Sequence, residues 1–384
     1  MRLRIRHVTT YEYDSPVAAS TQLVRMTPRG DLGQRVIDWH VRLEFLEPAI
    51  RDHRHSLRVG LAAHPIATDP SWAPRRSDNR DASSLQRATT ADDRYSVVRP
   101  PSNHDGGSEP SDVPSPPPQF SSVPNLANGD DGYGNRTHLI SLVVPHVATR
   151  LVAHGVVETS GTVGTSHEDR PSLPSSYWLR PTRHTGNGEA VVRFVHEFGT
   201  RLRSAWQDTD VPQVTGCLED LMQRVRERVD FRLGATDVLT TADEALRRGA
   251  GVCQDHAHVM IAVMRSLGVP ARYVSGYLWP GHHVAAQASH AWVDVFVPTI
   301  GWVGFDPANA CRPTEAYVRV AVGLDYFDVP PTRGVRRGGP NHESLGVTVE
   351  IDPVDRGDGS IPHVVCDEPS STSSGAAQPM AASV

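Results

Sequence analysis

The sequence predicts an α+β protein, and three patterns support that prediction. Polar and apolar residues alternate over 2–13 and 35–48, as is typical of strands that are buried on one face. Apolar residues with helical spacing occur over 189–229 and again over 253–267. Three strand-like runs, "ARYVSGYLW", "HAWVDVFV" and "GWVGFDP", come after the second helical segment. We therefore expect a β-rich N-terminal domain, followed by a core in which a helix packs on an antiparallel sheet.

The composition limits the classes of function. The chain of 384 residues is long enough for two or three domains, but only 38% of it is hydrophobic and 6% aromatic. Part of the chain is therefore expected to lie outside a packed core. The net charge of −6 gives no electrostatic reason to expect nucleic acid as a partner. The spacings typical of zinc fingers and phosphate-binding loops are also absent from the sequence.

The sequence contains no lysine, so all 38 basic residues are arginine. Codon bias explains this composition most simply. Schiff-base chemistry and a lysine general base are nevertheless excluded. Any cross-linking through lysine would have to act on other proteins, because this chain has no lysine amine to offer.

The N-terminal sequence "MRLRIRHVTTYEYDSPV" lacks the apolar core of a signal peptide, and no run approaches about 20 apolar residues. The sequence therefore predicts a cytoplasmic location and no membrane partner. Four cysteines, Cys217, Cys253, Cys311 and Cys366, are far apart and form no CxxC pair. We expect them to be reduced thiols.

The remaining elements follow in chain order. Residues 52–130 are rich in Arg, Ser, Asp and Pro and cannot bury enough apolar surface to offset the entropy of ordering, so we expect a largely disordered insertion. Strand signals return over 137–159. The predicted division is 1–160 for the N-terminal domain, 161–352 for the core with its C-terminal strands, and 353–384 for a disordered tail.

Cys253 lies at the predicted first turn of the helix that runs to about 267. The apolar run "VMIAVMRSLG" indicates a buried helix with a glycine stop, and Gly249 and Gly251 supply a tight backbone before it. The unpaired N–H groups of a first helical turn stabilise negative charge, so a thiolate would be favoured there. The same groups could receive a developing oxyanion. A lone cysteine without further context would more simply be a buried structural residue.

His290 and Asp306 supply that context. His290 opens the run "HAWVDVFV", and Asp306 ends the next run, "GWVGFDP", sixteen residues later. In an antiparallel hairpin the start of one strand lies beside the end of the next, so we expect the two side chains to be neighbours. The carboxylate would orient the imidazole, and the imidazole would take the proton of the thiol. Taken with a cysteine at a helix start, the pair favours a catalytic interpretation over a strand-edge histidine and a turn aspartate.

The same stretches resemble a known family. "GVCQDHAHVMIAVMRSLGVPARYVSGY", "SHAWVDVFVPTIGWVGFDPAN" and "VRVAVGLDYFDVPPTRG" look like the bacterial transglutaminase-like family, over roughly 187–350. This papain-like Cys-His-Asp superfamily includes transglutaminases, proteases and peptide N-glycanases. "HVTTYEYDSPV" and "DGYGNRTHLISLVVPH" resemble the β-rich domain that precedes the core in these proteins. By resemblance, Cys253 is the nucleophile, His290 the general base and Asp306 its partner.

Two features depart from the family pattern. His256 stands three residues after the cysteine, where an aromatic residue is expected, and this change could perturb the site. The insertion at 52–130 is longer than the family's N-terminal domain normally carries, and we expect it to loop out and leave the fold intact.

Nearby residues allow other interpretations. His256, His258, His282 and His283 suggest a metal site, but a structural zinc site needs four convergent ligands, so we predict no metal. Asp255 fits the dipole of a first helical turn. No calcium-binding loop of EF-hand type is present in the sequence. Trp292, Tyr277 and Trp279 are candidate substrate-binding residues, although core packing would explain them equally well.

The sequence thus predicts a cysteine enzyme without a cofactor, acting on a protein or peptide substrate. The Cys253 thiolate would attack a carboxamide or peptide carbonyl and form a thioester. Resolution by water would make the protein a protease or amidase, and resolution by an amine would make it a transglutaminase. The alternative is a catalytically inactive binding module that recruits partners through the Pro/Ser-rich insertion.

Overall fold

The computed structural model describes residues 1–30, 33–46, 125–161, 165–166, 173–208, 211–281, 289–297, 300–339 and 342–354. Most of the predicted insertion and nearly all of the predicted tail lie outside these ranges. The last six residues of the predicted insertion form a strand, β4 (Asn125–Asp130). None of the described helices is both long and apolar enough to cross a membrane.

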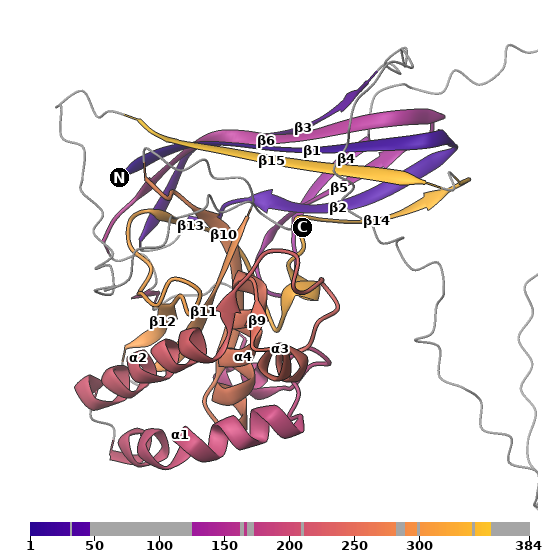
Figure 1. Cartoon of the computed structure of the whole chain (residues 1–384). Coiled ribbons are helices and arrows are strands. Elements are labelled where there is room, and N and C mark those ends of the chain that lie inside the picture. The colour runs from indigo at the N-terminus through magenta and orange to yellow at the C-terminus, as the bar shows by residue number, and fades with distance from the viewer. Residues whose placement is uncertain are drawn as a thin grey trace, which may run out of the picture. The chain divides into compact units, whose positions relative to one another are not determined.

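Two four-stranded antiparallel sheets contain the N-terminal strands (Figure 1). The first has the order β15-β1-β6-β3, and the second has the order β14-β2-β5-β4. Their strands are β1 (Arg2–Val17), β2 (Ala19–Thr27), β3 (Gln34–Phe45), β4, β5 (Arg136–Leu142), β6 (His146–Thr159), β14 (Thr332–Arg337) and β15 (Glu343–Pro353). The alternation predicted over 2–13 is confirmed in β1, where every second residue from Leu3 to Tyr13 is buried and the residues between them are more exposed, apart from buried Val8.

The C-terminal strands pair with the N-terminal ones. β15 pairs with β1 over the register Leu3↔Pro353 to Tyr13↔Glu343, and β14 pairs with β2. The sequence division placed these two strands with the core, because a strand pattern shows which face is buried but does not identify the partner strand. Both sheets are therefore completed by chain segments that lie more than 300 residues apart.

The core combines a five-stranded antiparallel sheet with four helices. The sheet has the order β13-β10-β11-β12-β7. Its strands are β7 (Thr165–Ser166), β10 (Ala271–Leu278), β11 (His290–Val297), β12 (Gly301–Phe305) and β13 (Tyr317–Gly323). The helices are α1 (Glu189–Asp208), α2 (Val211–Arg228), α3 (Ala242–Arg248) and α4 (Cys253–Ser266). Short elements complete the core: β8 (Asp230–Phe231) pairs with β9 (Ala250–Gly251), and two 3-10 turns are η1 (Ser175–Leu179) and η2 (Tyr326–Asp328).

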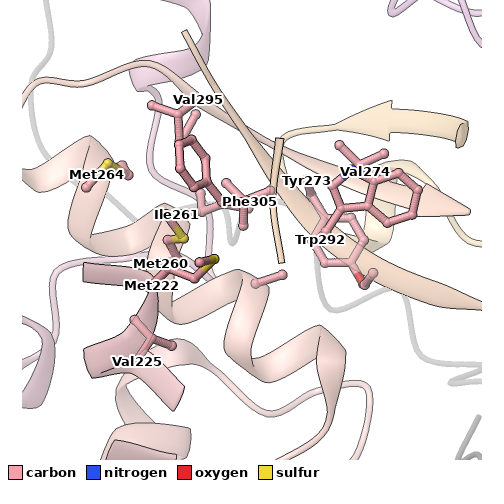
Figure 2. Packing of buried hydrophobic residues seen from close by; sticks show 14 of the residues in the cluster. Met222, Val225, Met260, Ile261, Met264, Tyr273, Val274, Trp292, Val295 and Phe305 are labelled. Atoms are coloured by element: carbon pink, nitrogen blue, oxygen red, sulfur yellow. The ribbon is translucent and has the colours of Figure 1, made fainter. Parts of the chain in front are cut away.

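Helix α4 is central to this core. Every residue from Asp255 to Arg265 is buried, and the helix packs against β10 and β11 on one side and against α1, α2 and α3 on the other. Figure 2 shows Met222 and Val225 of α2 near Met260 and Ile261 of α4. The predicted α+β fold, with a buried helix packed on an antiparallel sheet, is confirmed.

Two glycines fix the approach to α4. Gly249 ends α3 in the left-handed conformation, with φ of 63°, which a side chain disfavours. A Cβ atom on Gly251 would lie 2.6 Å from the Cβ of Asp255, so only glycine allows that side chain to fold back. The Asp255 carboxylate then accepts hydrogen bonds from the Val252 N–H at 2.8 Å and from the Thr236 hydroxyl at 2.6 Å. Asp255 therefore caps the helix start, and it lies in the first helical turn, as predicted.

Side-chain amides join the N-terminal sheets to the core sheet at its edge strand β13. The Gln34 amide donates to the Arg319 carbonyl and accepts from the Arg319 N–H, both at 2.8 Å. Asn135 makes the same pair of bonds with Val322, again at 2.8 Å. Each amide thus pairs with a backbone edge that would otherwise be unsatisfied.

A buried ion cluster crosses the same sheet. Oδ2 of Asp294 accepts from Nε and Nη2 of Arg272 at 3.0 and 2.9 Å, and lies 3.0 Å from Nη2 of Arg319. The Asp294 and Arg272 side chains are fully buried. The Arg272 guanidinium also lies 4.2 Å from the centroid of the Trp302 ring.

Replacing Asp294 with alanine is expected to lower the free energy of unfolding by about 3–5 kcal/mol, because two buried guanidinium groups lose their shared carboxylate. Urea denaturation measures this change. The matched control is Asp352→Ala, which removes an exposed aspartate of β15 and should change stability by no more than about 0.5 kcal/mol. Equal losses in the two variants would contradict a structural role for the cluster.

Candidate active site

Cys253 is the first residue of α4 and is partly exposed. The first four N–H groups of a helix have no intrahelical partner, so Cys253 lies at the positive end of the helix dipole, where negative charge is favoured. The predicted position at a helix start is confirmed. Cys217 and Cys311 are also reduced thiols.

The predicted proximity of His290 and Asp306 is also confirmed. In the hairpin of β11 and β12, Val293 pairs with Phe305, so the start of β11 meets the end of β12. The Nε2 atom of His290 lies 2.6 Å from Oδ2 of Asp306. The carboxylate therefore engages Nε2 and leaves Nδ1 available, and Cys253 lies near enough to the His290 ring to contribute to its raised pKa.

Asp306 is held by more partners than the sequence suggested. It is fully buried, and its carboxylate accepts from Nδ2 of Asn309 at 2.7 Å and from the Tyr317 hydroxyl at 2.8 Å. The backbone N–H groups of Ala308 and Asn309 donate to its other oxygen. Burial alone would raise the pKa of Asp306, but the charge of His290 and these hydrogen bonds outweigh it and hold the pKa below its ordinary value.

The protonation of His290 follows from the same contacts. Burial alone would lower the pKa of His290, but the adjacent Asp306 carboxylate and the hydrogen bond with Cys253 raise it to about 10. The ring is therefore an imidazolium at neutral pH. An imidazolium beside a thiol favours the thiolate, which is the reactive form of cysteine.

The three predicted substrate-binding residues lie in the core instead. Trp292, Tyr277 and Trp279 are at most 6% exposed, and none of them lines the cavity beside Cys253. Trp292 stacks against the His290 ring, with centroids 6.2 Å apart, and so helps to fix the orientation of the imidazole. Large aromatic side chains are recruited to cores as readily as to pockets, which is why the sequence alone could not separate the two roles.

His256 has a structural role. Its ring is fully buried, and its two nitrogens lie 2.8 Å from the Val252 carbonyl and 2.7 Å from the Val229 carbonyl. It stacks against Phe231, with centroids 6.2 Å apart. His256 thus packs like the aromatic residue expected there and ties the start of α4 to the end of α2.

No grouping of three His, Cys, Asp or Glu side chains suited to a metal occurs among the described residues. His258 instead accepts from the N–H of Tyr326 at 3.2 Å and packs 5.5 Å from the ring of His184. Burial lowers the pKa of His258 to about 3, so that ring is neutral. His282 and His283 lie outside the described residues.

A cavity of about 150 Å³ lies beside Cys253. It is lined by His7, Thr9, Val238, Val252, Cys253, Gln254, Tyr273, Ser275, Ser289, His290, Ala291, Tyr326, Pro331, Thr332, Leu345 and Val347. A hollow of about 420 Å³ between α1 and α2 holds Cys217, but it contains no histidine among its described lining residues.

The helix and antiparallel sheet, with a cysteine at the helix start and a histidine–aspartate pair on the sheet, define a papain-like α+β fold. Residues 207–307 match the transglutaminase-like superfamily, and residues 3–58 match the bacterial transglutaminase-like N-terminal region. The chain belongs to the transglutaminase-like superfamily.

Three comparisons extend this assignment. An uncharacterized protein of Mycobacterium leprae is 43% identical over 371 residues, which are 91% of this chain and 98% of that protein. A protein-glutamine gamma-glutamyltransferase of Pseudomonas aeruginosa is 35% identical over 83 residues, covering 20% of this chain and 12% of that enzyme. A crystal structure from Cytophaga hutchinsonii, provisionally named a cysteine protease, has the same fold, with a TM-score of 0.55, 15% identity and coverage of 92% of this chain and 91% of that one.

Proposed function

We propose that the protein is a cysteine-dependent acyl-transfer enzyme that acts on carboxamide or peptide carbonyls. The observation that supports this most directly is the hydrogen-bonded pair of His290 and Asp306 beside a cysteine at a helix start. Membership of the transglutaminase-like superfamily agrees with it.

In the first half of the reaction, the Cys253 thiolate attacks the carbonyl carbon of the substrate. Backbone N–H groups of the first turn of α4 receive the negative charge on the carbonyl oxygen. The C–N bond then breaks, the leaving nitrogen takes the proton from His290, and a thioester to Cys253 remains. Asp306 stabilises the imidazolium until that proton is transferred, and it orients the ring throughout this half.

In the second half, water or a second amine attacks the thioester. His290 accepts the proton of that nucleophile, the C–S bond breaks, and the thiolate is restored beside a protonated imidazole. Water yields a free acid, as in a protease or amidase, and an amine yields a new amide, as in a transglutaminase. The substrate we propose is a protein or peptide.

Two measurements test this function. Incubation with glutamine-containing peptides, with and without an isotope-labelled alkylamine, should yield cleavage, deamidation or amine incorporation by mass spectrometry. Cys253→Ala, which lacks the nucleophile, should give only background. Iodoacetamide at pH 6 should alkylate Cys253 at least about tenfold faster than Cys217, which is also partly exposed.

Equal alkylation of the two thiols at pH 6, together with peptides left unchanged, would contradict the enzyme proposal and favour an inactive binding module.

A further inference from the structure

One wall of the cavity beside Cys253 is formed by strands outside the core sheet and its helices. Strand β1 contributes His7 and Thr9, and β15 contributes Leu345 and Val347. Thr9 and Val347 are directly opposite each other in the register of these two strands. Residues from the N-terminal and C-terminal strands thus line the same space as the reacting sulfur.

The inward-facing residues of β1 change from apolar to polar where the strand reaches this cavity. Leu3 and Ile5 are fully buried apolar residues, whereas His7 and Thr9, next on the same face, are buried polar ones at 2% and 3% exposure. Burying a polar group is unfavourable unless it is hydrogen-bonded, so this change needs a physical reason.

A chain of hydrogen bonds satisfies these polar groups and ends at the cavity. The Tyr277 hydroxyl lies 3.0 Å from Nδ1 of His7, and Nε2 of His7 lies 3.3 Å from Oγ1 of Thr9. Tyr277 belongs to β10 of the core sheet, so the chain leads from the core through His7 to the Thr9 hydroxyl.

The chain is uncharged at neutral pH. Burial lowers the pKa of His7 to about 4, so its ring is neutral and has one N–H donor and one acceptor nitrogen. If Tyr277 donates to His7, then His7 donates to Thr9, whose own proton can be given to a carbonyl oxygen. If the direction is reversed, the Thr9 oxygen accepts from an N–H. Either direction complements an amide group.

The surroundings of Thr9 also disfavour charge. Among the described residues that line the cavity, none is Asp, Glu, Lys or Arg. The His290 imidazolium, the one cation among the described lining residues, is already paired with Asp306. A charged substrate side chain would lose hydration here without gaining a counter-charge.

We propose that Thr9, oriented by His7 and Tyr277, binds the substrate, and that Thr9, Leu345 and Val347 select an uncharged peptide segment beside the reacting carbonyl. Thr9 hydrogen-bonds an amide of that segment, and the two aliphatic residues contact an apolar side chain. This inference rests on the proposed function and assigns specificity to the N-terminal and C-terminal strands.

The first test removes only the hydroxyl. Thr9→Val should lower the rate of Cys253 labelling by a capped peptidyl chloromethyl ketone with leucine beside the reactive group by about 5- to 10-fold, as for one lost hydrogen bond. Thr9→Ser, which keeps the hydroxyl, should stay within about twofold of the unaltered protein. Thr10→Val is the matched control, because Thr10 faces away from Thr9 on the same strand. Alkylation by iodoacetamide, which has no peptide, should not change in any of them.

The second test introduces charge at Leu345, which is 41% exposed and so accommodates a polar side chain. The probes are chloromethyl ketones with lysine or glutamate in place of leucine. Leu345→Asp should raise the lysine-to-glutamate ratio of labelling rates by at least about fivefold, and Leu345→Arg should lower it similarly. Thr348→Asp and Thr348→Arg, on the exposed opposite face of β15, should leave the ratio unchanged.

The two proposals fail in different ways. If Cys253 labels fast and depends on His290, but Thr9→Val and the Leu345 variants match the unaltered protein, the specificity inference is overturned and the enzyme proposal stands. If Cys253 is no more reactive than Cys217 and the glutamine peptides are left unchanged, the enzyme proposal fails. Labelling that still distinguishes the Leu345 variants would then support the same surface as a binding site only.

Discussion

Replacing His290 with alanine is expected to reduce turnover by on the order of 10³-fold or more and to remove the reactivity of Cys253 at low pH. The imidazolium is the group that favours the thiolate and later gives its proton to the leaving nitrogen, and nucleophile and base act as one unit. Alkylation of Cys253 by iodoacetamide between pH 5 and pH 9, with turnover of a glutamine peptide, measures both effects.

The variant must be shown to be folded, because Asp306 loses its charged partner in a buried position. Removing one member of a buried pair costs about 3–5 kcal/mol, so urea denaturation accompanies the kinetics. His196→Ala is the matched control, since His196 is exposed on α1. A folded His290→Ala variant whose Cys253 still alkylates at the original rate at pH 6 would show that the imidazole does not activate the thiol.

The sequence predicted the parts of the site that depend on local order. A glycine turn before an apolar helix places Cys253 at a helix start, and a short hairpin places His290 beside Asp306. Both follow from the period and direction of single elements, together with one antiparallel pairing. The catalytic role of the three residues remains a prediction.

The rest of the site depends on contacts between distant segments, which an alternating pattern cannot identify. From the sequence, His7 and Thr9 are only alternating residues of a strand. In the structure, β1 lies between β15 and β6, and both residues line the cavity. Tyr317 comes from β13, on the far side of β10 from His290, and still donates to Asp306. One signal in the sequence could have identified β1 as part of the site. The polar residues His7 and Thr9 interrupt a face of the strand that is otherwise apolar.

Replacing Asp306 with asparagine is expected to reduce turnover by about 10²- to 10⁴-fold while preserving the shape of the site. The single oxygen of asparagine can still accept from Asn309 and Tyr317, but its NH2 group then faces the backbone N–H groups of Ala308 and Asn309, which lose their acceptor. It removes the negative charge that raises the pKa of His290, and burial then lowers that pKa. The alkaline limb of the pH–rate profile, where the imidazolium loses its proton, should therefore move to lower pH.

The same substitution should also change how the free energy of unfolding depends on pH. For His290 the folded-state pKa is raised from 6.5 to about 10, so the stabilisation from its pairing is complete below about 6.5 and is lost as the pH rises toward 10. For Asp306 the folded-state pKa is lowered, so its contribution is present above its ordinary pKa and is lost as the pH falls through the lowered one. The difference in unfolding free energy between the unaltered protein and Asp306→Asn should thus be greatest near pH 4 to 6.5.

Urea denaturation at pH 5, 7 and 9 measures that difference, and the variant Asp230→Asn, at an exposed aspartate of β8, corrects for general effects of charge. The difference in unfolding free energy between the unaltered protein and Asp306→Asn should shrink from pH 5 to pH 9. Above about pH 6.5 the unfolded chain loses the proton of His290 while the folded protein keeps it, so the stabilisation from the raised pKa declines as the pH rises. A difference that stays constant over this range would mean that Asp306 supports the fold without holding a proton on His290. Catalysis through a thiolate beside that imidazolium would then lose its electrostatic basis.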